Sequence, residues 1–233
     1  MQVVLASSNR GKLQEINSLL GGLNLSLAPQ SDFGVKPCEE PFESFLENAL
    51  AKARHASACT GLAALADDSG LLVDELKGWA GVRSARLYED WLDQRKRNPS
   101  PDDQQTAEDS LAFHARYQQG QISHDEANFF CLIHLLQRQR HALGVNCSGP
   151  IKARFVSVFV FLRSADDPLP LVGQGQWWGE LLPEPRGNNG HGYDPIFFDP
   201  KLGRTAAELS LEEKNTSSHR ALAAQAFCEA FQA

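Results

Sequence analysis

The sequence predicts a mixed fold of helices and strands, of the α/β or α+β class. Three segments carry this prediction. Val3 to Ala6 is a short apolar strand that leads through a polar turn into a helix. Phe42 to Ala58 repeats small and apolar residues at helical spacing. Ala153 to Leu162 is rich in aromatic and β-branched residues, as is typical of a buried core strand.

The first helix follows the first strand directly. Its apolar residues recur at intervals of three and four positions and stop at Gly21-Gly22, where a helix is expected to end. In the second helix, Asn48 and Lys52 lie four positions apart and therefore share one face. The N-terminal part thus predicts the order strand, polar turn, helix, helix.

The segment between Arg86 and Ala153 differs from its flanks in composition and in its pattern of apolar residues. A polar stretch with two prolines, Arg95 to Gln105, precedes helical patterns at about Thr106 to Gln119 and His124 to Leu143. We therefore predict a helical insertion at about residues 95–150 within a single domain of residues 1–233. The broad apolar face of its second helix must cover this chain's own sheet or a partner, and we expect packing within the chain.

The C-terminal part predicts a strand pair and a final helix. Leu171 to Trp178 is expected to pair with the core strand Ala153 to Leu162. A glycine-rich turn then precedes the apolar Ile196-Phe197-Phe198. From Leu209 to Phe231, a serine-rich turn leads into an amphipathic helix.

Composition excludes several classes of protein. The formal net charge of −7 argues against a general binder of nucleic-acid polymers or anionic membranes. No segment approaches the roughly 18 apolar residues of a membrane span, and Met1 to Leu5 lacks a signal peptide's cationic region, so we expect a cytoplasmic protein. The five cysteines never form a C-x-x-C pair, which disfavours a disulfide framework or a zinc site.

An acidic cluster, Asp67-Asp68-Ser69-Gly70, interrupts apolar sequence. Leu62 to Leu65 reads as a strand before it and Leu71 to Val73 as another strand after it. The pattern predicts two carboxylates in a turn at a strand end, where α/β folds commonly bind ligands. Two interpretations stay open at this point, a metal-binding acid site and ordinary turn chemistry.

A second polar cluster, Ser7 to Lys12, lies where the first strand feeds the first helix. Small hydroxyls, an amide and a lysine at a helix N-terminus form a natural cradle for an anion, although an ordinary helix cap with an exposed lysine has the same composition. The segment is not a Walker A loop, because Ala6 stands where its first glycine is required and Leu13 follows the lysine. A P-loop kinase or GTPase is therefore disfavoured.

Two clusters near the C-terminus are candidates for ligand contacts. Gly187 to Pro195 contains three glycines and an aromatic residue, so its backbone can approach a ligand closely, or it is a long hairpin. Glu213 to Arg220 groups two cations and a histidine before the last helix, and otherwise reads as a solvated face.

Taken in order, six motifs resemble the inosine triphosphate pyrophosphatase family, and they span most of the chain. The motifs are S-x-N-x-G-K (Ser7 to Lys12), F-x-E-N-A-x-x-K-A (Phe45 to Ala53), D-D-S-G-L (Asp67 to Leu71), G-V-x-S-A-R (Gly81 to Arg86), G-Y-D-P-I-F (Gly192 to Phe197) and E-K-x-x-x-S-H-R (Glu213 to Arg220).

The resemblance implies a fold and an activity. The implied fold is α/β, with an elongated mixed central sheet flanked by helices in two lobes and the active site in the cleft between them. The implied activity is Mg²⁺-dependent hydrolysis of nucleoside triphosphates with deaminated purines, such as ITP, dITP and XTP, to the monophosphate and pyrophosphate, which cleanses the nucleotide pool. Implied partners are the nucleotide and a second copy in a homodimer, with no nucleic-acid polymer and no membrane.

By the same resemblance, individual residues receive roles. Asp68 is the catalytic base and a magnesium ligand, with Asp67 and Glu40 as supporting carboxylates. Ser69 contacts the substrate, and Arg220 donates to a 6-keto oxygen that adenine lacks. The residues that hold phosphates are Ser7, Ser8, Asn9, Arg10, Gly11, Lys12 and Lys52. Those that enclose the base are His191, Gly192, Tyr193, Asp194, Lys214, His219 and Arg220.

Two departures from the family pattern leave alternatives open. His191 stands where the family usually has a phenylalanine that stacks on the purine, so a different modified nucleotide is an alternative substrate. The stretch from Arg86 to Arg154 is longer than the family pattern, so a non-catalytic nucleotide sensor whose inserted helices engage a protein partner is a further alternative.

Overall fold

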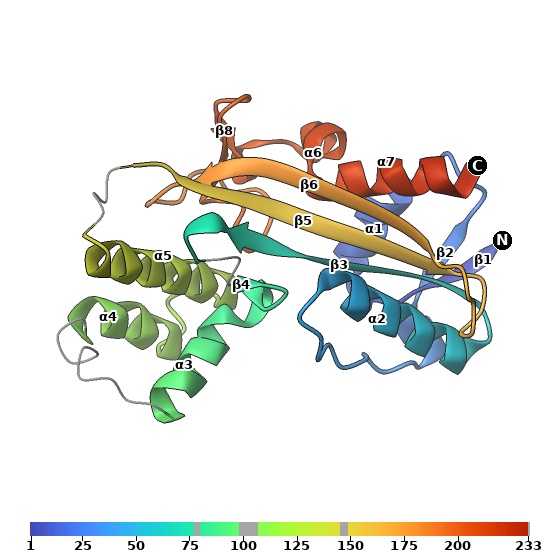
Figure 1. Cartoon of the computed structure of the whole chain (residues 1–233), viewed down its shortest axis with the longest axis horizontal. Coiled ribbons are helices and arrows are strands. Elements are labelled where there is room, and N and C mark those ends of the chain that lie inside the picture. The colour runs from blue at the N-terminus through green and yellow to red at the C-terminus, as the bar shows by residue number, and fades with distance from the viewer. Residues whose placement is uncertain (77–79, 98–106, 145–148, 233) are drawn as a thin grey trace. The chain divides into compact units, whose positions relative to one another are not determined.

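A computed structural model gives the structure of the protein and describes most of the chain. It covers residues 1–76, 80–97, 107–144 and 149–232 (Figure 1). Residues 98–106 and 145–148 of the predicted insertion, including Gln105 and Thr106, lie outside these ranges. Within them, no helix combines the length and the apolar character needed to cross a membrane.

The chain divides into two compact units, each built from separate stretches of sequence. The first unit contains Met1–Ser69, Phe155–Trp177 and Leu211–Ala233, and the second contains Gly70–Arg154 and Trp178–Ser210. The prediction of a single domain stays a prediction, as does an active site in a cleft between lobes.

Eight strands in the described ranges form one mixed sheet, in the hydrogen-bonded order β2-β1-β3-β5-β6-β7-β8 with β4 paired to β3. Strand β1 is parallel to β2 and β3, whereas the pairs β3-β4, β6-β7 and β7-β8 are antiparallel. The predicted pairing of β5 with β6 is confirmed. The strands are β1 (Gln2–Leu5), β2 (Ser26–Pro29), β3 (Ala63–Val73), β4 (Ala80–Gly81), β5 (Ile151–Leu162), β6 (Leu171–Leu181), β7 (Phe197–Asp199) and β8 (Arg204–Thr205).

Helices flank this sheet, which confirms the predicted mixed α/β class. The α-helices are α1 (Arg10–Leu19), α2 (Phe45–Thr60), α3 (Leu87–Arg97), α4 (Ala107–Gln118), α5 (His124–Ala142), α6 (Leu211–Ser217) and α7 (His219–Gln232). Short 3₁₀ turns are η1 (Gln30–Phe33), η2 (Asp74–Leu76), η3 (Ser84–Arg86) and η5 (Ala206–Glu208).

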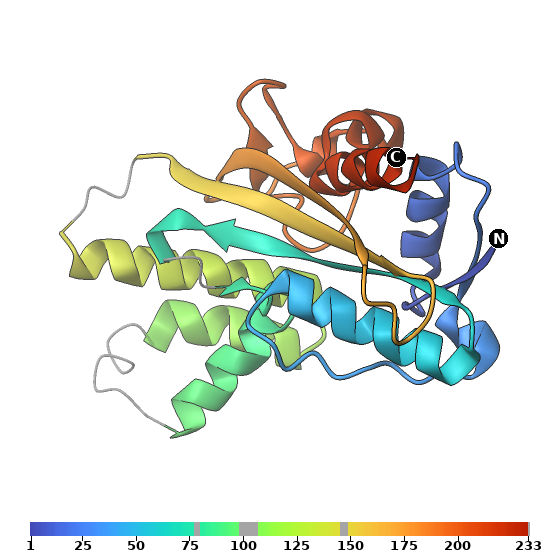
Figure 2. The same ribbon diagram turned by 45° about the vertical axis from the view of Figure 1, so that its right-hand side comes forward.

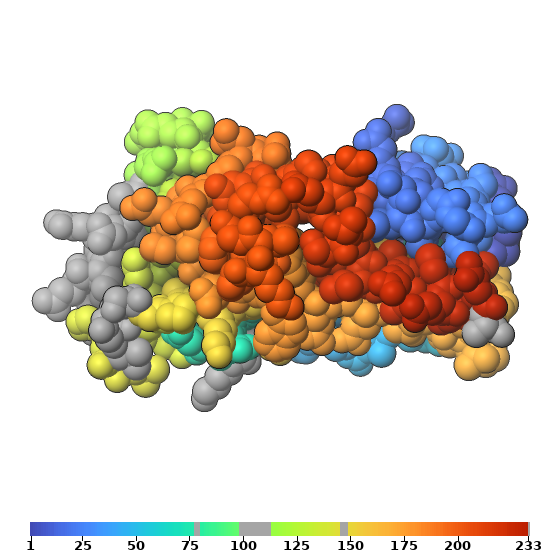
Figure 3. Space-filling model, turned by 90° about the horizontal axis from the view of Figure 1, so that it is seen from above, coloured from blue at the N-terminus to red at the C-terminus, as the bar shows by residue number. Residues whose placement is uncertain are grey.

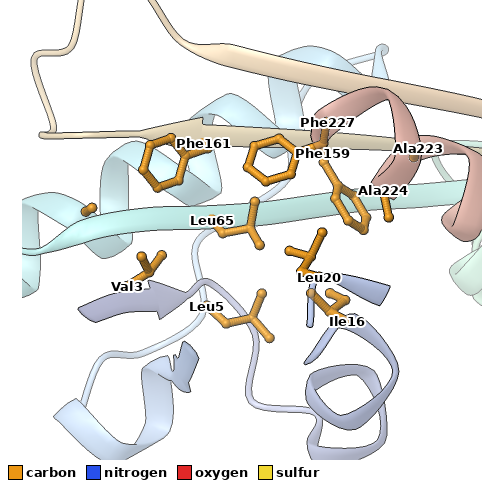
Figure 4. Close-up of a cluster of buried hydrophobic side chains, with 11 residues drawn as sticks. Val3, Leu5, Ile16, Leu20, Leu65, Phe159, Phe161, Ala223, Ala224 and Phe227 are labelled. Atoms are coloured by element: carbon orange, nitrogen blue, oxygen red, sulfur yellow. The ribbon is translucent and has the colours of Figure 1, made fainter. Parts of the chain in front are cut away.

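The first unit has three layers. Figures 1 and 2 show α2 on one face of β3 and β5 and α7 on the opposite face. Helices α1 and α7 contact each other, and Figure 3 shows the red atoms of α7 beside the blue N-terminal segment. The core between the sheet and these two helices is apolar (Figure 4). Its residues are Val3, Leu5, Ile16, Leu20, Ala63, Leu65, Phe159, Phe161, Ala223, Ala224 and Phe227.

Helix α2 begins later than its apolar pattern predicts. Ser44 is its N-cap, with its hydroxyl accepting a hydrogen bond from the Glu47 N–H at 3.3 Å. Gly61 ends the helix in the left-handed conformation with φ of 68°. The predicted start at Phe42 is therefore three residues too early, because the cap rather than the first apolar residue sets the boundary.

The second unit contains the three helices α3, α4 and α5, of which α5 contacts both others. The apolar face of α5 is buried within the chain at Phe129, Ile133 and Leu136, as expected, whereas Leu143 is exposed beyond the helix end. Asn128 of α5 is buried and accepts a hydrogen bond from the Tyr88 N–H at 3.0 Å. Its amide also donates to the Ala85 carbonyl at 3.1 Å, which fixes α5 against the start of α3.

Strand β3 corrects one sequence prediction. Ala63–Val73 is a single strand of 11 residues, not two strands separated by an acidic turn. The segment has β1 and β5 as hydrogen-bonded neighbours and is almost wholly buried, so ladder pairing overrides the turn tendency of Asp-Asp-Ser-Gly. Because β1 ends at Leu5, opposite Leu65, the carboxylates lie just beyond the end of β1 but inside β3.

Two glycines of β6 let α7 lie directly on the sheet. A Cβ at Gly175 would lie 2.2 Å from the His219 carbonyl oxygen and 2.3 Å from the Ala223 nitrogen. A Cβ at Gly173 would lie 2.4 Å from the Ala223 carbonyl oxygen. These obstacles are backbone atoms, so the start of α7 keeps its place only while both positions lack a side chain.

We predict that Gly175→Ala lowers the free energy of unfolding by about 3 kcal/mol, because the added methyl group forces α7 away from β6. Urea denaturation measures this change. Gly22→Ala is the matched control, since nothing lies within 4 Å of its Cβ. It should change the free energy by less than about 1 kcal/mol. Equal effects of the two substitutions would contradict the packing explanation.

Candidate active site

The adjacent carboxylates of β3 point to opposite faces of the sheet, as consecutive residues of a strand must. Asp67 contacts Lys12 of α1 and Arg220 of α7, whereas Asp68 contacts Lys52 of α2. Both acids are nearly inaccessible, with 3% and 6% of their surface exposed. Each acid therefore has a cation supplied by a helix that covers its own face.

Asp68 lies in a chain of three charged groups. The Lys52 Nζ is 2.9 Å from the Asp68 Oδ1 and 3.2 Å from the Glu40 Oε1. The other oxygen of Asp68, Oδ2, is buried and has no hydrogen-bond partner among the described residues. Burial raises the pKa of the Asp68 carboxyl above its ordinary value, although the Lys52 ammonium opposes this change.

The ammonium of Lys52 stays charged despite its burial. Burial alone would lower its pKa, but the carboxylates of Asp68, Asp67 and Glu40 outweigh that effect and raise the pKa above its ordinary value. A cation that is permanently charged and held beside an acid with a raised pKa suits a site that binds anions and moves protons.

Asp67 has the opposite electrostatic character. The Lys12 Nζ lies 2.9 Å from its Oδ1, and the Arg220 Nε lies 3.4 Å from its Oδ2. Burial alone would raise the pKa of Asp67, but the charges of Lys12, Arg220 and Lys52 hold that pKa well below its usual range. Asp67 therefore remains a permanent anion that orients the lysine and the arginine.

Arg220 is buried and meets protein groups on all sides of its guanidinium. Besides Asp67, its NH1 nitrogen donates to the Glu15 carboxylate at 2.6 Å and its NH2 nitrogen donates to the Ser69 hydroxyl at 3.3 Å. The arginine thereby joins α7 to α1 and β3. Its predicted contact with a 6-keto oxygen stays a prediction.

The turn after β1 has the structure that its sequence predicts, a strand leading into a helix N-terminus. Asn9 is the N-cap of α1, and its side-chain oxygen accepts hydrogen bonds from the Gly11 N–H at 2.9 Å and the Lys12 N–H at 3.1 Å. The Ser7 hydroxyl accepts from the Asn9 N–H at 3.2 Å. Lys12 is not a freely exposed lysine, because it is paired with Asp67.

Ser8 and Arg10 of the same turn are exposed. Gln30, which opens η1 after β2, is buried and lies with its Nε2 3.5 Å from the Ser8 hydroxyl oxygen. The Gln30 N–H also donates to the Ser7 carbonyl at 3.3 Å. Sequence reasoning missed Gln30, and its only signal was a polar residue directly after an apolar strand.

Glu15 was also missed by sequence reasoning. It lies three residues after Lys12, so both side chains share one face of α1. That spacing was available in the sequence, but its partner Arg220 is 205 residues away. Only the packing of α7 beside α1 reveals the pair.

The glycine-rich loop belongs to the second unit. Tyr193 is buried, and its hydroxyl donates to the Ser84 carbonyl at 2.6 Å. Asp194 is buried and accepts from the His191 N–H at 3.0 Å. The Gly192 N–H points outward from this turn, while the His191 side chain is 70% exposed. The predicted base contacts of these four residues stay predictions.

Lys214 and His219 lie at the junction of the last two helices. Lys214 is in the last turn of α6 and is half-buried. His219 begins α7, where its ring stacks on Phe155 with centroids 4.8 Å apart and planes 20° apart. Both residues belong to the first unit, as Arg220 does.

The acids present fit a magnesium ion. In the part of the chain that is described, no group of three or more His, Cys, Asp and Glu residues is arranged to hold a metal. Mg²⁺ does not require such a cage, since it is usually held by one or two carboxylates together with water and substrate phosphates. Asp68 with its unpartnered oxygen and Glu40 supply oxygen ligands of this kind.

The fold and these acid–lysine pairs define an α/β protein with a charged site built on strand β3 of a mixed sheet. Its sequence matches the model of the Ham1 family over residues 3–151 and 115–230. The chain belongs to this family, which confirms the resemblance carried by the six motifs.

Named relatives and solved structures agree with this assignment. The chain is 45% identical over 222 residues to a dITP/XTP pyrophosphatase of Ralstonia nicotianae, covering 95% of this chain and 92% of the relative. It is 45% identical over 225 residues to a dITP/XTP pyrophosphatase of Methylibium petroleiphilum, covering 97% and 94%. A HAM1 protein from Coxiella burnetii superposes with a TM-score of 0.75 at 36% identity, covering 100% of both chains.

We predict that Arg220→Met lowers the free energy of unfolding by about 3 kcal/mol, because it leaves the half-buried Glu15 without its cation and the buried Asp67 with Lys12 alone. Urea denaturation at neutral pH measures the loss. Arg83→Met is the control, since the Arg83–Asp90 pair is far more exposed than Arg220 and Asp67 and should contribute at most about 1 kcal/mol. A loss at Arg220 no larger than at Arg83 would show that the buried network does not stabilise the fold.

Proposed function

We propose that the protein is a nucleoside triphosphate pyrophosphatase. It hydrolyses ITP, dITP and XTP to the nucleoside monophosphate and pyrophosphate with Mg²⁺ as cofactor, and so removes deaminated purines from the nucleotide pool. Membership of the Ham1 family and relatives named dITP/XTP pyrophosphatase support the reaction class. The observation that carries the proposal is the environment of Asp68. Its pKa is raised, one of its carboxylate oxygens is paired with Lys52, and its other oxygen has no partner among the described residues.

Hydrolysis at the α-phosphorus requires a base that removes a proton from water. The raised pKa of Asp68 makes its carboxylate a stronger base than an ordinary aspartate. As the water oxygen bonds to the α-phosphorus, the proton passes to Asp68 and the bond from phosphorus to the bridging oxygen breaks. The electron pair of that bond leaves with pyrophosphate.

The leaving group carries several negative charges, which the protein must compensate. Lys12 and Lys52 are held at fixed positions by their acids. Lys12 lies in the first turn of α1, where backbone N–H groups favour anions. Neither lysine has to be ordered when the substrate arrives. When bound to Asp68 and Glu40, Mg²⁺ would offset further phosphate charge.

His191 allows a second candidate for the base of the substrate. His191 is exposed and able to stack on a purine, but it is also polar, unlike a phenylalanine. A pyrophosphatase for a different modified nucleotide is therefore the second candidate. The homodimer and the cytoplasmic location stay predictions.

The proposed activity is tested with a panel of triphosphates assayed for pyrophosphate release. We expect kcat/KM for ITP, dITP and XTP to exceed that for ATP by at least about 100-fold, since adenine presents a donor where these bases present a carbonyl. EDTA should abolish turnover and added Mg²⁺ should restore it. Preferred turnover of another modified nucleotide would favour the second candidate, and tight ITP binding without turnover would favour a nucleotide sensor.

Within that assay, Asp68→Asn should reduce pyrophosphate release by at least about 100-fold, because an amide cannot accept the proton from water. The fold should persist, since asparagine has nearly the same shape, and circular dichroism with a thermal melt checks this. Asp166→Asn, an exposed acid of the β5–β6 hairpin, should keep full turnover. Undiminished turnover of Asp68→Asn would refute the assigned base.

A further inference from the structure

Hydrogen bonds made by its backbone N–H groups fix the loop from Gly187 to Asp194. The Asn189 N–H donates to the Ala207 carbonyl at 3.0 Å, and the Asp194 carboxylate accepts from the His191 N–H at 3.0 Å. Gly190 has φ of 81°, and a Cβ there would lie 2.0 Å from the Asp194 Oδ2. The loop is therefore a preorganised turn, in which the Asp194 carboxylate binds a backbone N–H group of the loop.

The far side of the turn is anchored by Tyr193. Its buried ring places the hydroxyl 2.6 Å from the Ser84 carbonyl oxygen, and the Ser84 hydroxyl in turn accepts from the Leu71 N–H at 3.3 Å. The segment Gly81 to Arg86 thus joins β3 to the loop. Gly192 lies between His191 and Tyr193, and its N–H faces away from the turn.

One side chain from a distant helix holds that N–H. Asp125, in the first turn of α5, accepts the Gly192 N–H at 2.7 Å through its Oδ2, across 67 residues of sequence. Hydrogen bonds to a carboxylate are stronger than neutral ones. Ser123 and Glu126 form a capping box around this helix start, so the backbone that carries Asp125 is itself fixed.

The bond controls a residue with unusual freedom. Gly192 has φ of 62°, and nothing lies within 4 Å of the position of its Cβ. Without the carboxylate, only its anchored neighbours would hold Gly192 at this φ, because glycine itself has little preference for either sign. Because His191 directly precedes Gly192, the direction of its exposed ring depends on which of these conformations is populated.

We propose that Asp125 is a positioning residue that determines base selectivity, by fixing the Gly192 backbone and hence the presentation of His191 to a deaminated purine. This inference rests on the proposed function and extends it to the helical segment. Asp125 does not touch the reacting atoms in this scheme. Its loss reduces the fraction of molecules in the binding-competent loop conformation, which raises KM in proportion and leaves kcat unchanged.

Hydrogen exchange tests the bond itself, without any nucleotide. In Asp125→Ala, the Gly192 amide should exchange roughly tenfold faster than in the wild type, as expected for the loss of a charge-assisted hydrogen bond. Asp125→Asn keeps an acceptor oxygen at the same place and should retain most of the protection. Asp166→Ala removes the same charge from an exposed site and should change nothing. Unchanged exchange in Asp125→Ala refutes the proposal.

Kinetics test the consequence. For Asp125→Ala, KM for ITP should rise roughly fivefold with kcat within about twofold of the wild type, and the preference for ITP over ATP should fall. Asp125→Asn should recover at least half of the loss, and Asp166→Ala should match the wild type. Faster exchange with an unchanged KM, or an Asp125→Asn variant as impaired as Asp125→Ala, overturns the positioning role.

The test separates this inference from the proposed function. If the wild type releases no pyrophosphate from ITP, the proposed function fails, and the dissociation constant of ITP measured by calorimetry replaces KM. A weaker affinity of Asp125→Ala then supports the inference, and an equal affinity overturns it. Thermal melts of all three variants verify folding, which should persist because Asp125 and Asp166 are exposed.

Discussion

The alternation of side chains along β3 is the constraint on which the first unit depends. Two neighbouring aspartates in a buried strand must face opposite sides of the sheet, and an unpaired buried charge is strongly destabilising. Each face therefore needs its own cation. Lys52 of α2 serves one acid, and Lys12 of α1 with Arg220 of α7 serves the other. The positions of three helices are thereby coupled to one dipeptide.

This arrangement gives two identical residues different chemistry. Asp67 is surrounded by cations that keep its pKa low, and it holds Lys12 and Arg220 in place. Asp68 is paired with Lys52, lies near the carboxylate of Glu40, and has one oxygen without a hydrogen-bond partner among the described residues. Burial raises the pKa of this carboxyl. Opposite pKa shifts in adjacent groups are a means of assigning separate tasks to them. The proposed division makes Asp67 the structural anion and Asp68 the base.

Sequence patterns predicted the elements whose apolar periodicity is strong, such as β1 with its polar turn, α5 and the β5–β6 pair. They failed at β3, because local turn tendency in Asp-Asp-Ser-Gly competes with ladder pairing to strands that lie far away in the sequence. They also missed Glu15 and Gln30, whose partners Arg220 and Ser8 lie 205 and 22 residues away. Such contacts exist only once the helices and strands have packed.

Part of the proposed base recognition is separated from the hydrolytic groups within the chain. All the groups proposed to act on phosphates, from Lys12 to Asp68, lie in the first unit, and the glycine-rich loop lies in the second. The loop's fixing contacts, from Ser84 and Asp125, come from that same second unit. Substitutions in the loop or in α5 can therefore alter the choice of base without disturbing the ion pairs that set the pKa of Asp68. In the proposed scheme, a histidine at position 191 therefore affects recognition of the base and leaves the charge balance of the hydrolytic site intact.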